Sequence, residues 1–96
     1  MLEIRPTCEN CNKPLPPEST DAMICTFECT FCQECVDDVL HNVCPNCGGG
    51  FEKRPIRPVV ELAKYPASNK VVSKPVDLEK FQETLAKFRN VDSNKR

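Results

Sequence analysis

The spacing of apolar side chains predicts two helices. One apolar stripe at the i, i+3, i+4 and i+7 period of a helix face consists of Val36, Val39, Leu40 and Val43. A second stripe, towards the end of the chain, consists of Leu78, Phe81, Leu85 and Phe88. Asp77 stands before it, and Asp is a residue type that caps helix N-termini. The pattern therefore predicts a short helix over residues 32–43 and an amphipathic helix over residues 77–90.

Short alternating stretches predict strands. Leu2 and Ile4 alternate with charged residues, so residues 1–7 are expected to form an edge strand that Pro6 ends. Residues 22–31 are expected to form a hairpin, and residues 51–54 a last short strand. Four prolines make residues 55–76 an extended connector, with one helical turn at 59–64 after Pro58. Residues 91–96 are expected to fray.

The first 54 residues contain too few large apolar side chains to be stable without another source of free energy. The chain has no Trp, but it has eight Cys, all between residues 8 and 47. A unit of this size needs disulfides, a metal or a partner. The N-terminus does not resemble a secretory signal, so we expect a reducing, cytoplasmic location, where cysteines bind metal. No stretch approaches the roughly 18 apolar residues of a membrane span, and no membrane partner is expected.

The cysteines have the spacing of metal ligands, C-x2-C-x13-C-x3-C-x2-C-x2-C-x8-C-x2-C. Zn²⁺ takes four tetrahedral ligands, and sets of four cysteines are typical of closed structural sites. Eight cysteines therefore predict two structural zinc ions. The residues after the first and last C-x2-C pairs are expected to need positive φ, which Asn12 tolerates and Gly48 adopts freely.

Two pairings of the cysteines satisfy this count. In the sequential pairing, the first four cysteines bind one ion and the last four bind the other. In the interleaved pairing, site 1 contains Cys8, Cys11, Cys32 and Cys35, and site 2 contains Cys25, Cys29, Cys44 and Cys47. We favour the interleaved pairing, because Cys32 and Cys35 lie at the start of the predicted helix and can complete a tetrahedron with the first pair.

The order and gaps of the cysteines resemble those of a RING finger in an all-cysteine form. Phe31 before Cys32 and the ending Cys44-Pro45-Asn46-Cys47 carry this resemblance. More closely, the stretches LEIRPTCENC, LPPESTDAMICTFECTFCQECV and CPNCGGGFEKRPIRP resemble a small bacterial family designated domain of unknown function 1272. The resemblance implies a bacterial cytosolic origin and assigns no activity. The chain departs from RING ligases at Glu9, Asn10 and Gly48, and the central helix carries no Trp.

These observations predict a small, metal-stabilised α+β domain with a RING-like or treble-clef double zinc site. It comprises a two-zinc domain (1–54), a connector (55–76), a C-terminal helix (77–90) and a tail (91–96). Its expected function is that of a zinc-binding structural and protein-interaction module, and no enzymatic activity is expected. His41, the only histidine, is expected to lie on the surface.

Three alternative functions have some support in the sequence. A nucleic acid could bind to a basic edge formed by Lys53, Arg54 and Arg57, although the net charge of −1 gives no general attraction to phosphates. A ubiquitin-ligase activity follows only from the RING resemblance. Thiol redox chemistry would use Cys32 and Cys35 at the helix start. The apolar stripe of the C-terminal helix is expected to pack on the zinc domain, to form a homodimer or to bind a partner.

Overall fold

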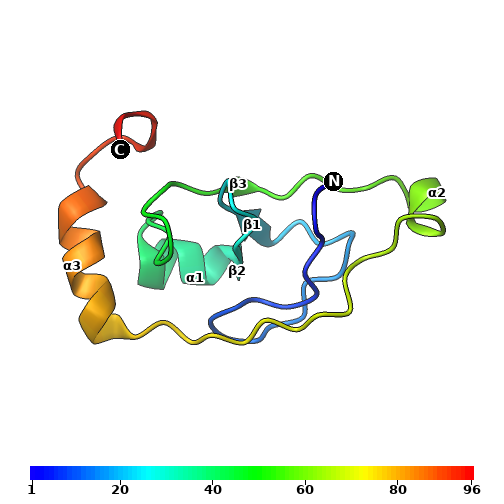
Figure 1. Cartoon of the computed structure of the whole chain (residues 1–96), viewed down its shortest axis with the longest axis horizontal. Helices are drawn as coiled ribbons and strands as arrows, with labels where there is room; N and C mark the ends of the chain where they lie inside the picture. Colours follow the sequence, from blue (N-terminus) through cyan, green and yellow to red (C-terminus); the bar gives the residue numbers. More distant parts are fainter.

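A computed structural model describes all residues, 1–96. Its centre is a three-stranded antiparallel sheet in the order β2-β1-β3 (Figure 1). The strands are β1 (Ala22–Ile24), β2 (Thr30–Cys32) and β3 (Glu52–Lys53). β1 pairs with β2 in the register that places Ala22 opposite Cys32, and it pairs with β3 in the register that places Met23 opposite Lys53. The predicted hairpin and last strand are therefore present.

The core lies between this sheet, the central helix and the C-terminal helix. Leu15, Leu40 and Val43 are fully buried. The rings of Phe31 and Phe51 meet edge to face, with their centroids 5.5 Å apart. The large apolar side chains are too few to close this core alone, and six buried cysteines complete it: Cys8, Cys25, Cys29, Cys32, Cys35 and Cys44. The α+β class that the sequence predicts is confirmed.

The central helix is shorter than predicted. It begins with α1 (Gln33–Cys35) and continues as a π-helical turn, η1 (Val36–Leu40). It ends because His41 and Asn42 both adopt the left-handed conformation, with φ of 50° and 59°. The Asn42 side chain accepts a hydrogen bond from the Phe51 N–H, at 2.9 Å. This sharp ending turns the chain so that Val43 enters the core as a loop residue.

Residues 1–7 do not form the predicted edge strand. Their carbonyl groups are instead paired with groups from distant segments: Arg57 donates to Leu2, and the Ser68 N–H donates to Ile4. Ile4 is buried. A pattern of only two alternating apolar residues does not identify a strand, because it also fits any extended segment with one buried side chain.

After β3 the chain leaves the sheet and returns along the N-terminal segment (Figure 1). α2 (Val59–Leu62) forms the distant turn, and α3 (Leu78–Phe88) closes the other end of the molecule. The tail is ordered rather than frayed, since it forms η2 (Ser93–Lys95) and Arg96 donates to the carbonyls of Asn42 and Gly48. None of the helices has the length and apolar character that are needed to cross a membrane.

Asp77 caps α3 as predicted, since its side chain accepts hydrogen bonds from the N–H groups of Glu79 and Lys80. Asp77→Ala should lower the free energy of unfolding by about 1 kcal/mol, the usual contribution of an N-cap. Asp92→Ala is the matched control, because Asp92 precedes η2 without a side-chain capping bond. Urea unfolding followed by circular dichroism would measure both, and equal losses in the two variants would contradict the capping role.

Candidate metal centre

Four cysteines from three segments form the first cluster. The sulfurs of Cys8, Cys11, Cys32 and Cys35 all lie within 4.8 Å of one another. Cys11 and Cys32 are 3.7 Å apart at Sγ. In a tetrahedron with Zn–S bonds of about 2.3 Å, the sulfurs are about 3.8 Å apart. The cluster therefore has the donor set and dimensions that a four-coordinate metal ion requires. Three of its cysteines are buried and Cys11 is exposed.

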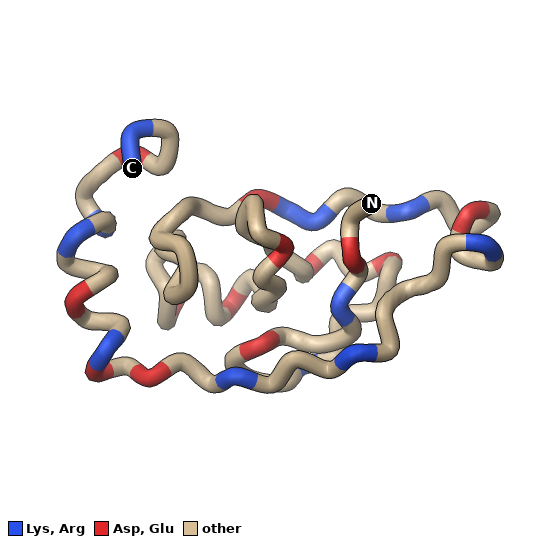
Figure 2. The backbone as a smooth tube through the Cα atoms, viewed as in Figure 1, with Lys and Arg blue, Asp and Glu red and all other residues tan.

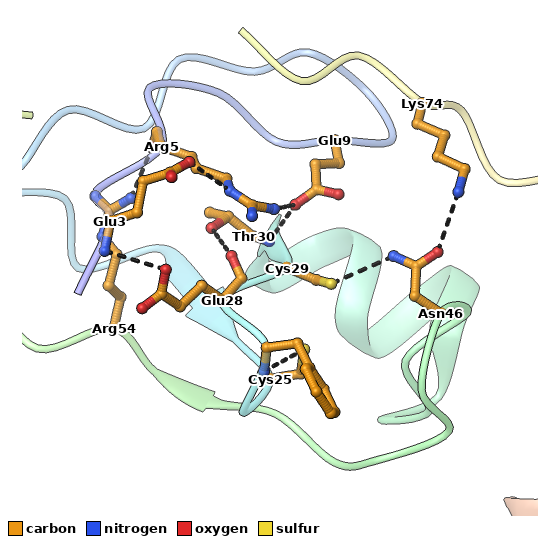
Figure 3. Close-up of polar contacts among 11 residues, drawn as sticks. Glu3, Arg5, Glu9, Cys25, Glu28, Cys29, Thr30, Asn46, Arg54 and Lys74 are labelled. Carbon is orange, nitrogen blue, oxygen red and sulfur yellow. Dashed lines mark hydrogen bonds and ion pairs between the residues drawn. The ribbon is translucent and has the colours of Figure 1, made fainter. Parts of the chain in front are cut away.

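Three cysteines form the second cluster, in which the sulfurs of Cys25, Cys44 and Cys47 lie within 4.8 Å of one another. Cys29, from the other end of the hairpin turn, falls outside that mutual limit. Its sulfur accepts a hydrogen bond from the Asn46 side chain instead, at 3.3 Å (Figure 3). Both clusters could hold a metal ion, and the second presents three close donors with Cys29 beside them.

The two outer C-x2-C pairs fold as the same turn. In the first pair, the Asn12 N–H donates to the Cys8 carbonyl and the Cys8 N–H donates to the Lys13 carbonyl. In the second pair, Gly48, Cys44 and Gly49 make the equivalent bonds. Asn12 and Gly48 have φ of 63° and 78°, which confirms the predicted positive φ. The turn directs both sulfurs of each pair to the same side, as a metal ligand pair requires.

Each turn also contains an asparagine whose side-chain amide reaches a sulfur of its own cluster. Asn10 donates to Cys35 at 3.4 Å, and Asn46 donates to Cys29 at 3.3 Å. Hydrogen bonds of this kind hold a ligand in place and reduce its charge. Sequence reasoning missed these residues. The available signal was the repetition of Cys-x-Asn-Cys in the two outer pairs.

Glu9, inside the first turn, is a buried acid. Its carboxylate accepts hydrogen bonds from Arg5 at 2.9 Å and from the Thr30 N–H at 2.5 Å (Figure 3). The Arg5 guanidinium supplies the opposite charge that makes the burial tolerable. Glu9 thus fastens the first cysteine pair to β2, which is a structural role.

Burial shifts the titration of the cluster thiols. It raises the pKa of Cys35 and of Cys44 well above the ordinary thiol value, and neighbouring cysteine sulfurs add to the increase. Removal from water also raises the pKa of Cys29 and Cys32, because it disfavours the charged thiolate. At these four positions burial therefore favours the neutral thiol when no cation balances the charge of a thiolate.

The three residues of the basic edge considered in the sequence differ in exposure. Arg54 is only 3 % exposed, and its guanidinium donates to the carbonyls of Arg5, Leu15 and Pro16. Arg57 donates to Leu2 and Tyr65. Of the three residues, only Lys53 is exposed, and Arg57 is half-buried. Figure 2 shows Lys and Arg interspersed with Asp and Glu along the chain, and these three residues do not form one exposed basic surface.

The apolar stripe of α3 packs mostly against the rest of the chain. Phe81 and Leu85 are buried in the same core as the cysteines. Phe88 lies directly over Gly48, where an added Cβ would be 2.5 Å from its ring. Leu78 remains 55 % exposed. Three of the four side chains of the stripe are therefore packed within one chain. His41 is exposed, as predicted.

The fold and the two sites define a small cysteine-rich α+β domain with two clusters that could bind metal. The chain belongs to the family described as protein of unknown function (DUF1272), which matches residues 1–57. It is also similar to an uncharacterized protein, R02474, of Rhizobium meliloti (strain 1021). That protein is 59 % identical over 75 residues, which cover 78 % of this chain and 89 % of the relative. No solved structure matches the chain.

Proposed function

We propose that the protein is a zinc-binding module with interleaved, RING-like ligand pairing. The observation that carries this proposal is the first cluster, in which two cysteines before the sheet and two at the central helix bring their sulfurs within 4.8 Å of one another. A sequential pairing would need Cys25 and Cys29 in that cluster in place of Cys32 and Cys35. The second ion then takes Cys25, Cys44 and Cys47, with Cys29 as its fourth ligand.

The proposed ligand pairing gives zinc a structural role. Each ion joins segments that are far apart in sequence, and each joins one outer turn to the β1–β2 region. A treble-clef arrangement of turn, hairpin and helix is consistent with this order. Sites with four cysteine ligands leave no open coordination position for substrate, so the module is not expected to be an enzyme.

The cellular role that we propose is interaction with another protein. Apolar side chains at and near α2 are exposed, with values of 52 % for Ile56, 79 % for Val59 and 83 % for Val60. They lie away from the cysteine clusters, on the distant turn of the chain (Figure 1). If they contact a partner, the variant Val60→Asp should lose proteins that the native chain retains on an affinity matrix. An unchanged set of retained proteins would count against this surface.

Native mass spectrometry with elemental analysis tests the metal proposal. Two zinc ions per chain are expected, with all eight thiols reactive after unfolding in a chelator. A metal-free chain whose mass is reduced by two hydrogens per cysteine pair would contradict the proposal, because disulfides would then hold the fold. A different thiophilic metal at the same stoichiometry would correct only its identity.

Zinc binding should depend strongly on pH. Because burial holds Cys35 and Cys44 as neutral thiols in the metal-free chain, Zn²⁺ must displace their protons. The apparent affinity should therefore fall as the pH is lowered, at every pH below the ordinary thiol pKa of about 8.5. The stability of any metal-free chain that stays folded has the opposite dependence, because its buried thiols with raised pKa values favour the fold below about pH 8.5, and this contribution is lost as the pH rises. Calorimetry in two buffers of different ionisation enthalpy would count the released protons.

A further inference from the structure

The two metal sites share a connection to one distant segment, residues 74–88, which we call the C-terminal strap. Asn10 and Asn46 occupy equivalent places in the two cysteine turns, and each uses both ends of its amide. The Nδ2 group donates to a cysteine sulfur. The Oδ1 atom accepts from the strap: Asn10 from the Val76 N–H at 2.9 Å, and Asn46 from the Lys74 ammonium at 3.4 Å. Figure 3 shows Asn46 between Cys29 and Lys74.

The orientation of both amides follows from their partners. A backbone N–H and a lysine ammonium can only donate, so Oδ1 must face the strap in both cases. The Nδ2 group is then left for the sulfur, which accepts. Rotation of either amide would break both bonds at once, so each asparagine links the position of a sulfur to the position of the strap.

The strap has a further bond to the first turn and three apolar anchors. The Lys74 N–H donates to the Glu9 carbonyl at 2.8 Å. Phe81 and Leu85 are buried, and Phe88 covers Gly48, the residue directly after Cys47. Most of the strap's polar contacts therefore go to residues that stand between, or directly beside, two proposed ligands of one metal ion.

We propose that metal binding and strap docking are coupled through Asn10 and Asn46, so that the strap secures the ligands and the bound metal secures the strap. This inference rests on the proposed function. Bound metal fixes both turns, which places the two amides and the Glu9 carbonyl where the strap can reach them. Release of the strap would expose Phe81 and Leu85. By thermodynamic reciprocity, whatever separates α3 from the cysteine clusters also weakens metal binding by the same factor.

An undocked strap has a clear signature. α3 has 11 residues, and isolated helices shorter than about 12–15 residues are marginal in water. Undocking should therefore unfold α3, and its amide hydrogens should exchange quickly. Because loss of metal would also unfold the cysteine module, exchange has to be compared among metal-loaded full-length variants.

The experiment measures zinc affinity by competition with a chromophoric chelator, and hydrogen exchange by mass spectrometry. Asn46→Ala and Asn10→Ala should each bind one of the two ions about 10- to 100-fold more weakly, as is usual for residues that orient ligands. In the metal-loaded variants, the amide hydrogens of α3 should also exchange faster, while those of β1 and β2 stay protected. The larger effect is expected for Asn10, because its strap bond is shorter. Asn69→Ala is the control, since Asn69 is exposed and outside both turns.

Phe81→Ala tests the reverse direction, because this side chain anchors the strap and offers no metal ligand. It should weaken zinc binding although every cysteine and both asparagines remain. The inference is overturned if two zinc ions bind to all variants with native affinity, or if the asparagine variants lose affinity without any change in α3 exchange. A native chain that binds no metal would instead refute the proposed function.

Discussion

A chain that carries Cys32→Ser is expected to lose its cooperative unfolding transition and to behave as a largely unfolded polypeptide. Cys32 is 1 % exposed, ends β2 and stands as the N-cap of α1. Its sulfur belongs to the four-cysteine cluster, which joins the N-terminal turn to the sheet and helix. Serine keeps the size of the side chain but replaces a thiolate with an alcohol, which binds Zn²⁺ poorly.

Magnitudes decide the outcome of this substitution. A structural zinc site contributes roughly 10–16 kcal/mol of binding free energy in small domains. Whole domains are stable by only about 5–15 kcal/mol. Loss of one site therefore removes as much free energy as the fold has. The apolar core cannot compensate, because six of its buried side chains are themselves cysteines.

Cys47→Ser is the comparison variant. Cys47 is exposed and belongs to the second cluster, so this variant keeps every ligand of the first site. It should bind the second ion more weakly, without losing it, and keep the structure around the first cluster. Circular dichroism during thermal unfolding, with zinc counted by mass spectrometry, separates the two. A Cys32→Ser chain that unfolds cooperatively, within about 1 kcal/mol of the native protein, would contradict a structural role for the first site.

Local chemistry was predictable where one residue type suits one backbone position. Asp77 as a helix cap and the positive φ of Asn12 and Gly48 follow from side-chain chemistry alone, and the structure has all three. The grouping of cysteines required more than spacing, since sequential and interleaved pairings satisfy the same count. Only the fold shows which sulfurs lie together, because β1 and β2 pair so that Cys32 lies opposite Ala22.

The errors arose where distant segments meet. Arg54 was read as a surface cation because arginine is usually exposed, and nothing local shows that three carbonyls from residues 5–16 surround it. The alternating pattern around Leu2 predicts a strand, but the Leu2 carbonyl pairs with Arg57, which is more than 50 residues away in the sequence. No local pattern indicates such a partner. The asparagines of the two turns were missed since their bonds depend on the returning strap.

Arg54→Met is expected to destabilise the fold by about 3 kcal/mol. The substitution keeps an unbranched apolar stem of similar length and removes the guanidinium. That group donates to the carbonyls of Arg5, Leu15 and Pro16 at distances of 2.9, 3.1 and 2.8 Å. Each lost bond costs about 1 kcal/mol, and more where the carbonyl stays buried. The Leu15 bond is fully buried, so water cannot replace it.

The unfavourable burial of the Arg54 charge opposes this loss of stability, and it sets the upper limit of the expected destabilisation. No acid pairs with Arg54, burial lowers its pKa, and its Nε group has no hydrogen-bond partner. Removal of the guanidinium relieves that unfavourable burial, which is why the expected loss does not exceed about 3 kcal/mol. Arg54→Lys distinguishes geometry from charge, because a single ammonium group cannot reach three carbonyls on two sides as a planar guanidinium can.

Lys53→Met is the matched control, since Lys53 is the exposed residue directly before Arg54 and the last residue of β3. Urea unfolding of the zinc-loaded chains should give a clear loss for Arg54→Met, a similar loss for Arg54→Lys, and a change within about 0.5 kcal/mol for Lys53→Met. If Arg54→Lys were as stable as the native chain, charge rather than the fork of hydrogen bonds would hold this site. If Arg54→Met also left the free energy of unfolding unchanged, the N-terminal segment would be held by Ile4 and the metal-bound turn alone.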